Sequence, residues 1–323
     1  IRNVLSAKIV KIILFILVCY DFTRVNHEII SPKYHIPNKN ILNEKEYLDK
    51  YLTKDSTVKL LNEDYSKFRI FDAIGNQNRW SVFDIENVNG YHPAKLNLYN
   101  DMIEGIRKNG YNIWPIGILK MLNVKYLILP ESNFTHPDFI NKGSSSMYYF
   151  GPYEKYDGEL IQMNVFELKE SLPRLYFVEN LSYMNNVSIL DEIINNKFNP
   201  IKQSYTSNDI AIDGYQFNID NADVVLNSWT PNELRFTTNT STNQFLVISE
   251  IFYPYGWSVV DNKDKTYEIY KVNESIRGIF VPKGEYHFKM IFNPKDVKVG
   301  STLSFSAFFL ILILLFYECL IRQ

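Results

Sequence analysis

Cysteine is scarce in this chain of 323 residues, which has 2 cysteines, Cys19 and Cys319. Both lie in the apolar segments at the two ends of the chain, and the region between them has none. Suppose that each segment crosses a bilayer and that the region between them stays on one side. Cys19 then lies at the end of its segment nearer that region, and Cys319 lies at the far end of its own, so about 30 Å of hydrocarbon separates the two thiols. A disulfide needs Cα atoms within about 7 Å of each other. The sequence therefore predicts neither a disulfide framework nor a thiolate metal site.

An excess of charge is also lacking. The chain has 34 basic and 36 acidic residues, which gives a net charge of −2. No basic stripe is visible along the sequence, and this argues against nucleic acid as a partner.

Motifs for metal, cofactor or nucleophilic chemistry are missing as well. No two of the 5 histidines have the spacing of metal ligands on a helix. The sequence has no Gly-x-Ser-x-Gly, Walker or dinucleotide-binding motif. The neighbouring carboxylates Glu63–Asp64 and Asp84/Glu86 are most simply interpreted as solvated surface groups. We therefore expect no metal, no cofactor and no catalytic residue in this chain.

Long apolar runs, in contrast, are present at both ends. The run from Leu303 to Ile321 is nearly continuous and has a single charged residue, Glu318. As a helix it is about 28 Å long, which is enough to cross the hydrocarbon core of a bilayer. This run predicts a transmembrane helix over residues 300–321.

The N-terminal run, from Lys11 to Tyr20, is shorter and permits three interpretations. A signal peptide would need a small-x-small cleavage site after it, and a lipoprotein signal would need a small residue in place of Val18. We therefore expect a truncated transmembrane helix over residues 1–20, and we interpret the initial Ile as a sign that the chain is part of a longer protein. The basic residues that flank the two runs are balanced, so they do not decide the orientation in the membrane.

Residues 21–205 alternate between helical and strand patterns, which predicts an α/β domain with a mixed sheet. Apolar residues at i, i+3 and i+4 mark amphipathic helices, and short β-rich runs mark buried strands. The predicted helices are Glu44–Lys54, Pro93–Lys108 and Val187–Pro200; the predicted strand is Phe68–Gly75; and Pro115–Pro130 is predicted as a helix followed by a strand.

Residues 206–299 have a different pattern, with about six to eight short strands separated by turns, which is typical of an antiparallel β-sandwich. Apolar and polar residues alternate in Glu233–Thr238 and Glu285–Phe292, and Thr266–Val272 is predicted as one strand. The stretch Phe245–Val260 is predicted as an aromatic hairpin in which Gly256 lets the chain reverse before a buried Trp257. Aromatic residues make up 15% of the chain, and in this hairpin we favour a sandwich core over an exposed sugar-stacking face.

The C-terminal third resembles a known family in its motifs. The pattern of that family is a strand ending in Ser-Glu, a Tyr-Pro-Gly-Trp turn, an Asp-Gly-Lys turn, an Arg-Gly strand, a Pro-x-Gly turn and a Gly before the last span. The matching residues here are Ser249, Glu250, Tyr253, Pro254, Gly256, Trp257, Asp261, Lys263, Asn273, Arg277, Gly278, Pro282, Gly284, Pro294 and Gly300. With Asn89–Ile103, Leu122–Pro130 and Leu172–Val178 upstream, the chain resembles the C-terminal part of bacterial YfhO-like multi-span membrane proteins. An additional Tyr255 and Asn262 in place of a glycine depart from the pattern.

The resemblance implies a relation to GT-C-type glycosyltransferases, which transfer a sugar from a polyprenyl-phosphate carrier to a cell-surface glycopolymer. It also implies that the region between the two apolar ends lies on the extracytoplasmic side of the bacterial cytoplasmic membrane. The catalytic loop of such enzymes has no counterpart here, so we expect a part that supports acceptor recognition or structure. The alternative is a non-catalytic, membrane-anchored module that binds envelope components. A tethered hydrolase is disfavoured because no nucleophile–base arrangement is present.

One pair of loops has the composition of a sugar-binding surface. Trp80 and Tyr91 could provide stacking planes, and Asn78, Arg79 and His92 could donate hydrogen bonds to hydroxyl or phosphate groups. We therefore expect these residues to form a ligand site, if the chain has one.

Overall fold

The computed structural model describes residues 7–30, 45–74, 78–90, 95–108, 114–130, 133–150, 158–194, 197–208 and 214–321. The chain divides into two units, Ile1–Thr53 and Lys54–Gln323. The described residues of the first unit form helices α1 (Ala7–Ile30) and α2 (Lys45–Leu52). The second unit is mixed α+β, with three sheets whose strand pairs are mostly antiparallel.

The first sheet is a mixed sheet, as the sequence predicts for this region. Strand β1 pairs in parallel with β2 and β3, and β5 pairs antiparallel with β3 and β4. In spatial order the strands are β2 (Glu86–Asn87), β1 (Arg69–Asp72), β3 (Val124–Leu129), β5 (Leu160–Leu168) and β4 (Phe139–Tyr148). Two short helices, α3 (Ser56–Leu61) and the 3-10 helix η1 (Arg79–Phe83), contribute apolar side chains to a core with β1, β3, β4 and β5.

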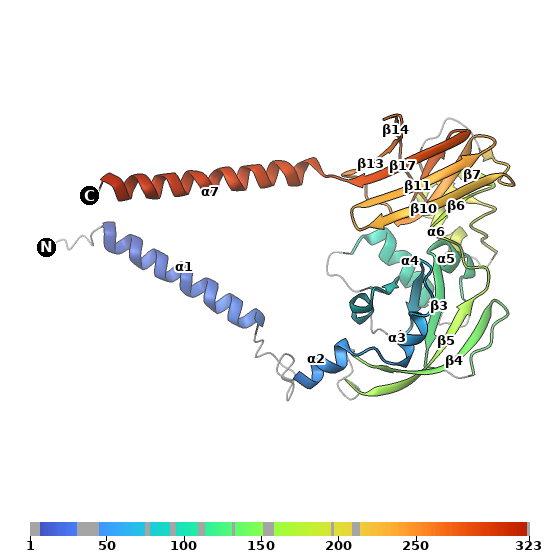
Figure 1. Ribbon diagram of the computed structural model, residues 1–323, viewed down its shortest axis with the longest axis horizontal. Coiled ribbons are helices and arrows are strands. Elements are labelled where there is room, and N and C mark those ends of the chain that lie inside the picture. Colours follow the sequence, from blue (N-terminus) through green and yellow to red (C-terminus); the bar gives the residue numbers. More distant parts are fainter. Residues whose placement is uncertain are drawn as a thin grey trace. The chain divides into compact units, whose positions relative to one another are not determined.

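The other two sheets face each other and share one apolar core (Figure 1). One of these two sheets has five strands, and below it is called the five-stranded sheet. It contributes Leu234, Phe236, Phe288 and Met290, which the alternating patterns in the sequence predicted as the inward face of their strands. Its strand order is β10 (Ala222–Thr230), β11 (Glu233–Thr240), β17 (Gly284–Phe292), β13 (Trp257–Asp261) and β14 (Thr266–Tyr267). The seven-stranded sheet has the order β6 (Leu175–Phe177), β12 (Gln244–Ile251), β16 (Ile276–Val281), β15 (Tyr270–Val272), β8 (Ser204–Thr206), β7 (Asn180–Tyr183) and β9 (Tyr215–Gln216).

The predicted aromatic hairpin is wrong in two respects: its two strands are not paired, and Trp257, predicted to be buried, is only half-buried. Strand β12 belongs to the seven-stranded sheet and β13 to the five-stranded sheet, so the turn between them carries the chain from one sheet to the other. Gly256 has a φ of +84°, which provides the predicted change of direction. A second crossing splits the predicted strand Thr266–Val272 into β14 and β15, which lie in different sheets.

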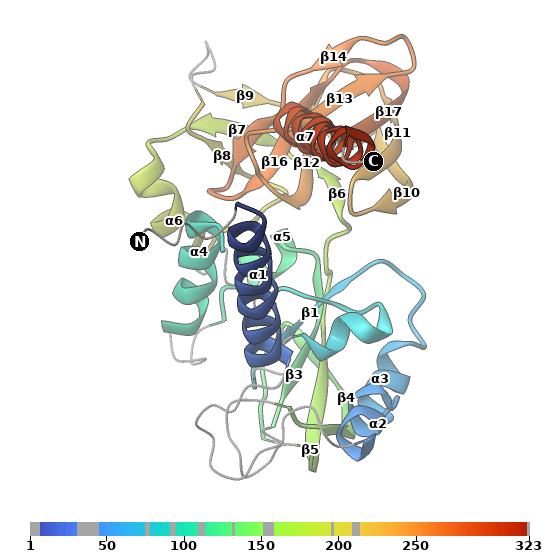
Figure 2. The same ribbon diagram turned by 90° about the vertical axis from the view of Figure 1, so that its left-hand side faces the viewer.

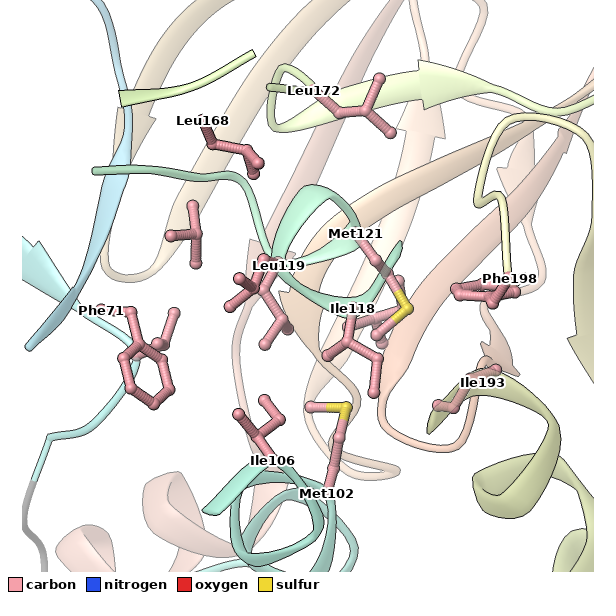
Figure 3. Close-up of a cluster of buried hydrophobic side chains, with 14 of the residues drawn as sticks. Phe71, Met102, Ile106, Ile118, Leu119, Met121, Leu168, Leu172, Ile193 and Phe198 are labelled. Atoms are coloured by element: carbon pink, nitrogen blue, oxygen red, sulfur yellow. The ribbon is translucent and has the colours of Figure 1, made fainter. Parts of the chain in front are cut away.

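A larger apolar core joins the first sheet to the seven-stranded sheet through three helices, α4 (Asn97–Lys108), α5 (Ile116–Met121) and α6 (Asn186–Ile194). Helix α6 contacts both α4 and α5, and it lies beside α4 in Figure 2. Figure 3 shows Met102 and Ile106 of α4 below Ile118, Leu119 and Met121 of α5. Because helix and sheet side chains mix in this core, the two regions of the second unit are held together by buried apolar surface.

The predicted domain boundary lies inside the seven-stranded sheet. Strands β6, β7 and β8 end at or before Thr206, and β12, β15 and β16 follow it, yet all of them belong to this sheet. The division into residues 21–205 and 206–299 therefore stays a prediction.

The last helix, α7 (Lys295–Ile321), is long and apolar, and its described side chains are exposed. Among the described residues it provides the one candidate membrane span, Lys295–Leu314. It begins before the predicted start at residue 300 and includes the predicted apolar run. At the other end, α1 continues to Ile30, past the predicted limit of residue 20, and residues 1–6 lie outside the described part, so the N-terminal span stays a prediction.

Candidate functional site

The loop residues predicted as a ligand site are only partly described. Trp80 is 0% exposed, and its indole nitrogen donates a hydrogen bond to Asp72 Oδ2 at 2.8 Å. Arg79 is 1% exposed and lies 2.8 Å from Asp55 Oδ2. Asn78 is exposed.

Buried in this way, Trp80 does not offer a face to a sugar, and Arg79 already has a carboxylate partner. The sequence pattern predicted an exposed polar loop because it does not show the partners of these two side chains. The partners, Asp72 and Asp55, lie earlier in the chain. Tyr91 and His92 lie outside the described residues, so their role in a ligand site stays a prediction.

The structure instead brings together four charged side chains from both regions of the second unit. Arg69 contacts Glu86 at 3.3 Å and Glu250 at 3.2 Å, and Arg174 contacts each of the same two carboxylates at 2.7 Å. Arg69 and Glu86 belong to the first sheet, Glu250 belongs to the seven-stranded sheet, and Arg174 directly precedes β6. We call this closed set of two arginines and two glutamates the Arg–Glu ring.

The Arg–Glu ring has further hydrogen-bond partners, although Arg174 Nε has none among the described residues. Arg69 Nη1 also donates to the carbonyl oxygens of Ser249 at 2.6 Å and Leu122 at 3.2 Å. Trp229 Nε1 donates to Glu250 at 3.2 Å, and the Arg174 guanidinium lies over the Trp229 ring at 5.0 Å. Burial opposes the charge of Arg69, but Glu250 and Glu86 outweigh it, so the pKa of Arg69 lies above its usual value.

A cavity of about 530 Å³ adjoins the Arg–Glu ring. It is lined by the ends of β2 and β12, by the turn that follows β2, by α4, by the first residue of β13 and by β16. Among the described residues of its wall, the basic ones are Arg69, Lys95 and Arg277, and the one acidic residue is Glu250. The wall is therefore net positive, which favours an anionic group in the cavity. Its volume is in the range of sites that hold a small molecule.

Arg277 differs from the arginines of the Arg–Glu ring. It is 5% exposed, and its guanidinium lies over the Trp257 ring at 3.9 Å. Its Nε donates to the carbonyl oxygen of Ile251 at 3.0 Å, and its Nη1 lies 3.3 Å from Met290 Sδ. Within the described part of the chain, no carboxylate forms an ion pair with it.

The pKa of Arg277 reflects this setting. Burial lowers it to about 10, while Glu250 acts to raise it and Arg69 to lower it further. The side chain is therefore still charged at neutral pH, and no ion pair with a described residue neutralises it. A buried cation of this kind has unused capacity to bind an anion.

Neutral polar groups complete the wall. Tyr99 donates from its hydroxyl to the carbonyl oxygen of Val88 at 2.8 Å, and burial raises the pKa of Tyr99 to about 12, so it is a neutral phenol at pH 7. The amides of Asn87, Asn89 and Asn100 also line the cavity. Such groups are suited to hydroxyl-rich ligands, since amides both donate and accept hydrogen bonds.

The geometry does not indicate catalysis. In the described ranges, no group of three or more His, Cys, Asp or Glu side chains could hold a metal ion. The one carboxylate among the described residues of the cavity wall, Glu250, is engaged by two arginines and Trp229. What the arrangement can do is bind a ligand that combines an anionic group with hydroxyls.

The motifs quoted for the family resemblance contain part of this site. Ser249, Glu250, Trp257 and Arg277 were noted as motif residues, and all four line the cavity. The residues that sequence reasoning missed are Arg69 and Arg174, and Glu86 was interpreted as a solvated carboxylate. A charged residue inside an apolar strand, as in Phe68-Arg-Ile-Phe71 and Leu172-Pro-Arg-Leu175, was the available signal, since a buried charge needs a partner.

Comparison with known proteins gives little further information. No family model matches the chain, and no curated protein matches it. One solved structure is similar, the cryo-EM structure of the arabinofuranosyltransferase AftD from mycobacteria, with 12% identity, a TM-score of 0.21, and coverage of 42% of this chain and 7% of that chain. A TM-score this low carries no argument about fold or function, and the resemblance to YfhO-like proteins stays a prediction.

Proposed function

We propose that this chain is the C-terminal, extracytoplasmic portion of an integral membrane protein related to the GT-C glycosyltransferases that use polyprenyl-phosphate sugars. In this proposal the cavity beside Arg277 recognises a sugar that carries an anionic group, such as a sugar phosphate or an acidic unit of a cell-surface glycopolymer. The chain contributes recognition, and the chemistry is carried out elsewhere in the parent protein.

Two observations support the proposal, one on the membrane span and one on the ligand site. The helix α7 has the length and apolar character to cross a bilayer. Four of the motif residues noted from the sequence, Ser249, Glu250, Trp257 and Arg277, come from three strands, yet they meet at one cavity. Motif residues that converge on a cavity are better explained by a shared ligand than by four separate packing roles.

The single observation that carries the recognition role is the buried, unneutralised charge of Arg277 beside Trp257 in a positive cavity. Burying a charge without a partner costs free energy, and the cost is offset when a ligand supplies the missing anion. Arginine binds phosphate and carboxylate groups through two parallel hydrogen bonds.

Ligand titration of the full chain in detergent tests the recognition role, with glucose 1-phosphate as the charged probe and methyl glucoside as its neutral counterpart. We expect glucose 1-phosphate to bind and methyl glucoside to bind at least tenfold more weakly, a difference of about 1.4 kcal/mol. Arg277→Gln should weaken glucose 1-phosphate binding at least tenfold, and Arg277→Lys should weaken it less.

The matched control is Arg235→Gln. Arg235 lies on β11, its side chain is 53% exposed, and it pairs with Glu233 away from the cavity, so its loss should leave binding unchanged. Equal affinity of the wild type and a folded Arg277→Gln variant for glucose 1-phosphate would contradict the proposal.

A second candidate function is a structural or interaction module with no small ligand, and the Arg–Glu ring favours it because the ring joins the first sheet to the seven-stranded sheet. The two functions differ in the titration, since a structural module binds neither probe.

The side of the membrane is tested separately by placing one cysteine at Ser241, in the exposed turn after β11, in a Cys19→Ser/Cys319→Ser background. Labelling by a membrane-impermeant maleimide on intact cells supports the extracytoplasmic side, and labelling only after lysis contradicts it.

A further inference from the structure

The turn between β12 and β13 exposes two aromatic side chains next to the start of α7. Tyr253 is 41% exposed and Tyr255 is 67% exposed. Their rings lie 5.9 Å apart, edge to face. Within the described part of the chain, no hydrogen bond is formed by either hydroxyl. We call Tyr253-Pro254-Tyr255-Gly256 the aromatic turn.

The aromatic turn is fixed to the segment that leads into α7. The nitrogen of Asn293 donates to the carbonyl oxygen of Gly256 at 2.6 Å. The Tyr253 ring lies 6.3 Å from the Phe292 ring. A Cβ atom at Gly256 would lie 2.9 Å from atoms of both Phe292 and Pro294, so only glycine allows this close approach. Helix α7 begins at Lys295, directly after these contacts (Figure 1).

The positions of the charged residues in α7 indicate how deep its first residues lie in the bilayer. No charged residue occurs from Val299 to Tyr317, and this run is about 28 Å long as a helix, close to the thickness of a hydrocarbon core. Lys298 is then at the edge of the hydrocarbon, and Pro294 lies about 6 Å further out. The headgroup layer on each side of a bilayer is about 5–8 Å thick. The start of α7, with Lys295, therefore falls within this layer.

From this geometry we propose that the aromatic turn inserts into the headgroup layer of the same bilayer that α7 crosses, an inference that rests on the membrane span in the proposed function. Tyrosine is enriched at this depth because its ring prefers the apolar side and its hydroxyl the wet side of the interface. The contacts of Gly256 with residues 292–294 keep the turn beside the start of the helix, whatever the tilt of α7. Lys295 and Lys298 add attraction to lipid phosphates at the same level.

The inserted turn has a consequence for the ligand cavity. Trp257, which follows the aromatic turn directly, carries the stacked guanidinium of Arg277. A turn held in the headgroup layer places the cavity close to the membrane surface. A ligand attached to a lipid carrier reaches such a site more easily than one free in solution, which agrees with the proposed substrate class.

Spin labelling of the full chain in nanodiscs of phosphatidylcholine and phosphatidylglycerol tests the inference. In the Cys19→Ser/Cys319→Ser background, single cysteines replace Tyr255 in the aromatic turn, Leu310 in α7, and the exposed Tyr65 and Tyr183 as controls. Power saturation with oxygen and a water-soluble nickel chelate measures the depth of each label. We expect the Leu310 label in the hydrocarbon, the Tyr255 label in the headgroup layer, and both control labels in water.

The outcomes separate the two proposals. A Tyr255 label as accessible to the nickel chelate as the Tyr65 label, with the Leu310 label still in the hydrocarbon, overturns the membrane contact of the turn alone. A Tyr255 label that is immobilised but at aqueous depth assigns the turn to a protein contact and also overturns the inference. A Leu310 label in water contradicts the membrane span itself.

Discussion

The second unit contains two buried arginines that each lie over a tryptophan ring, and they differ in their partners. Arg174 lies over Trp229 and has two carboxylates at 2.7 Å. Arg277 lies over Trp257 and has no carboxylate partner among the described residues. A paired buried charge is a structural element, whereas an unpaired one lowers stability and has capacity left for a ligand. The comparison therefore predicts opposite results for the same substitution at the two positions.

The largest effect is expected for Arg174→Met. Removing this arginine leaves Glu86 and Glu250 with Arg69 as their only guanidinium in the Arg–Glu ring. We expect a loss of about 3–5 kcal/mol in the free energy of unfolding, because a buried ion pair is broken and its carboxylates stay behind. Thermal or urea unfolding of the detergent-solubilised chain measures it. The exposed Arg235→Met serves as the control and should change stability by less than about 0.5 kcal/mol.

Glu250→Gln is expected to separate stability from ligand binding. The amide still accepts a hydrogen bond but loses its charge, so we expect a loss of about 1.5–3 kcal/mol in stability. The same change removes a carboxylate from the cavity wall, so affinity for glucose 1-phosphate should rise severalfold. A parallel loss of both properties would show that the Arg–Glu ring and the cavity do not have the separate roles that the comparison assigns to them.

Arg277→Met tests the same substitution at the arginine that has no carboxylate partner among the described residues. Methionine retains apolar contact with Trp257 and removes a buried charge that lacks a carboxylate partner, so stability should change by no more than about 1 kcal/mol in either direction. Binding of glucose 1-phosphate should be lost in the same variant. A destabilisation as large as that of Arg174→Met would identify Arg277 as a second structural arginine, and calorimetry on the two variants side by side decides this.

The sequence predicted those parts of the fold that depend on local periodicity. The alternation in β11 and β17 placed Leu234, Phe236, Phe288 and Met290 in the core, and the helix and strand in Pro115–Pro130 are found as α5 and β3. Periodicity works in these cases because one face of each element is buried. The aromatic turn was recognised as a turn for the same local reason, since Gly256 marks it.

What the sequence did not predict depends on pairing over long separations. The turn chemistry at Gly256 does not determine whether β12 and β13 share a sheet, and they do not. Likewise, Trp80 and Arg79 have the composition of an exposed loop, but Asp72 and Asp55 hold them in the interior. The site was found only in part because its four ring members come from four separate stretches of the chain. A charge within an apolar strand indicates that a partner exists but does not identify it.

The smallest effect concerns a third kind of ion pair, one that is partly exposed. Asp64 lies 2.6 Å from Lys125 and accepts hydrogen bonds from Tyr126 at 2.8 Å and from Ser66 at 2.9 Å. Burial acts to raise the pKa of Asp64, but these partners outweigh it and lower the pKa to about 2. For a carboxylate whose folded pKa is lowered, the stabilisation is present above its unfolded pKa and is lost as the pH falls through the folded pKa.

We therefore expect Asp64→Asn to cost about 0.5–1 kcal/mol at pH 7 and nearly nothing at pH 2. The two stability curves should converge between about pH 4 and pH 2, because protonation of Asp64 in the wild type removes what the substitution removes. Urea unfolding over this pH range measures the convergence, and the exposed Asp220→Asn should follow the wild type throughout. Stability curves that stay parallel down to pH 2 would show that Asp64 acts through its shape and not its charge. Asp64 would then say nothing about the difference between paired and unpaired charges.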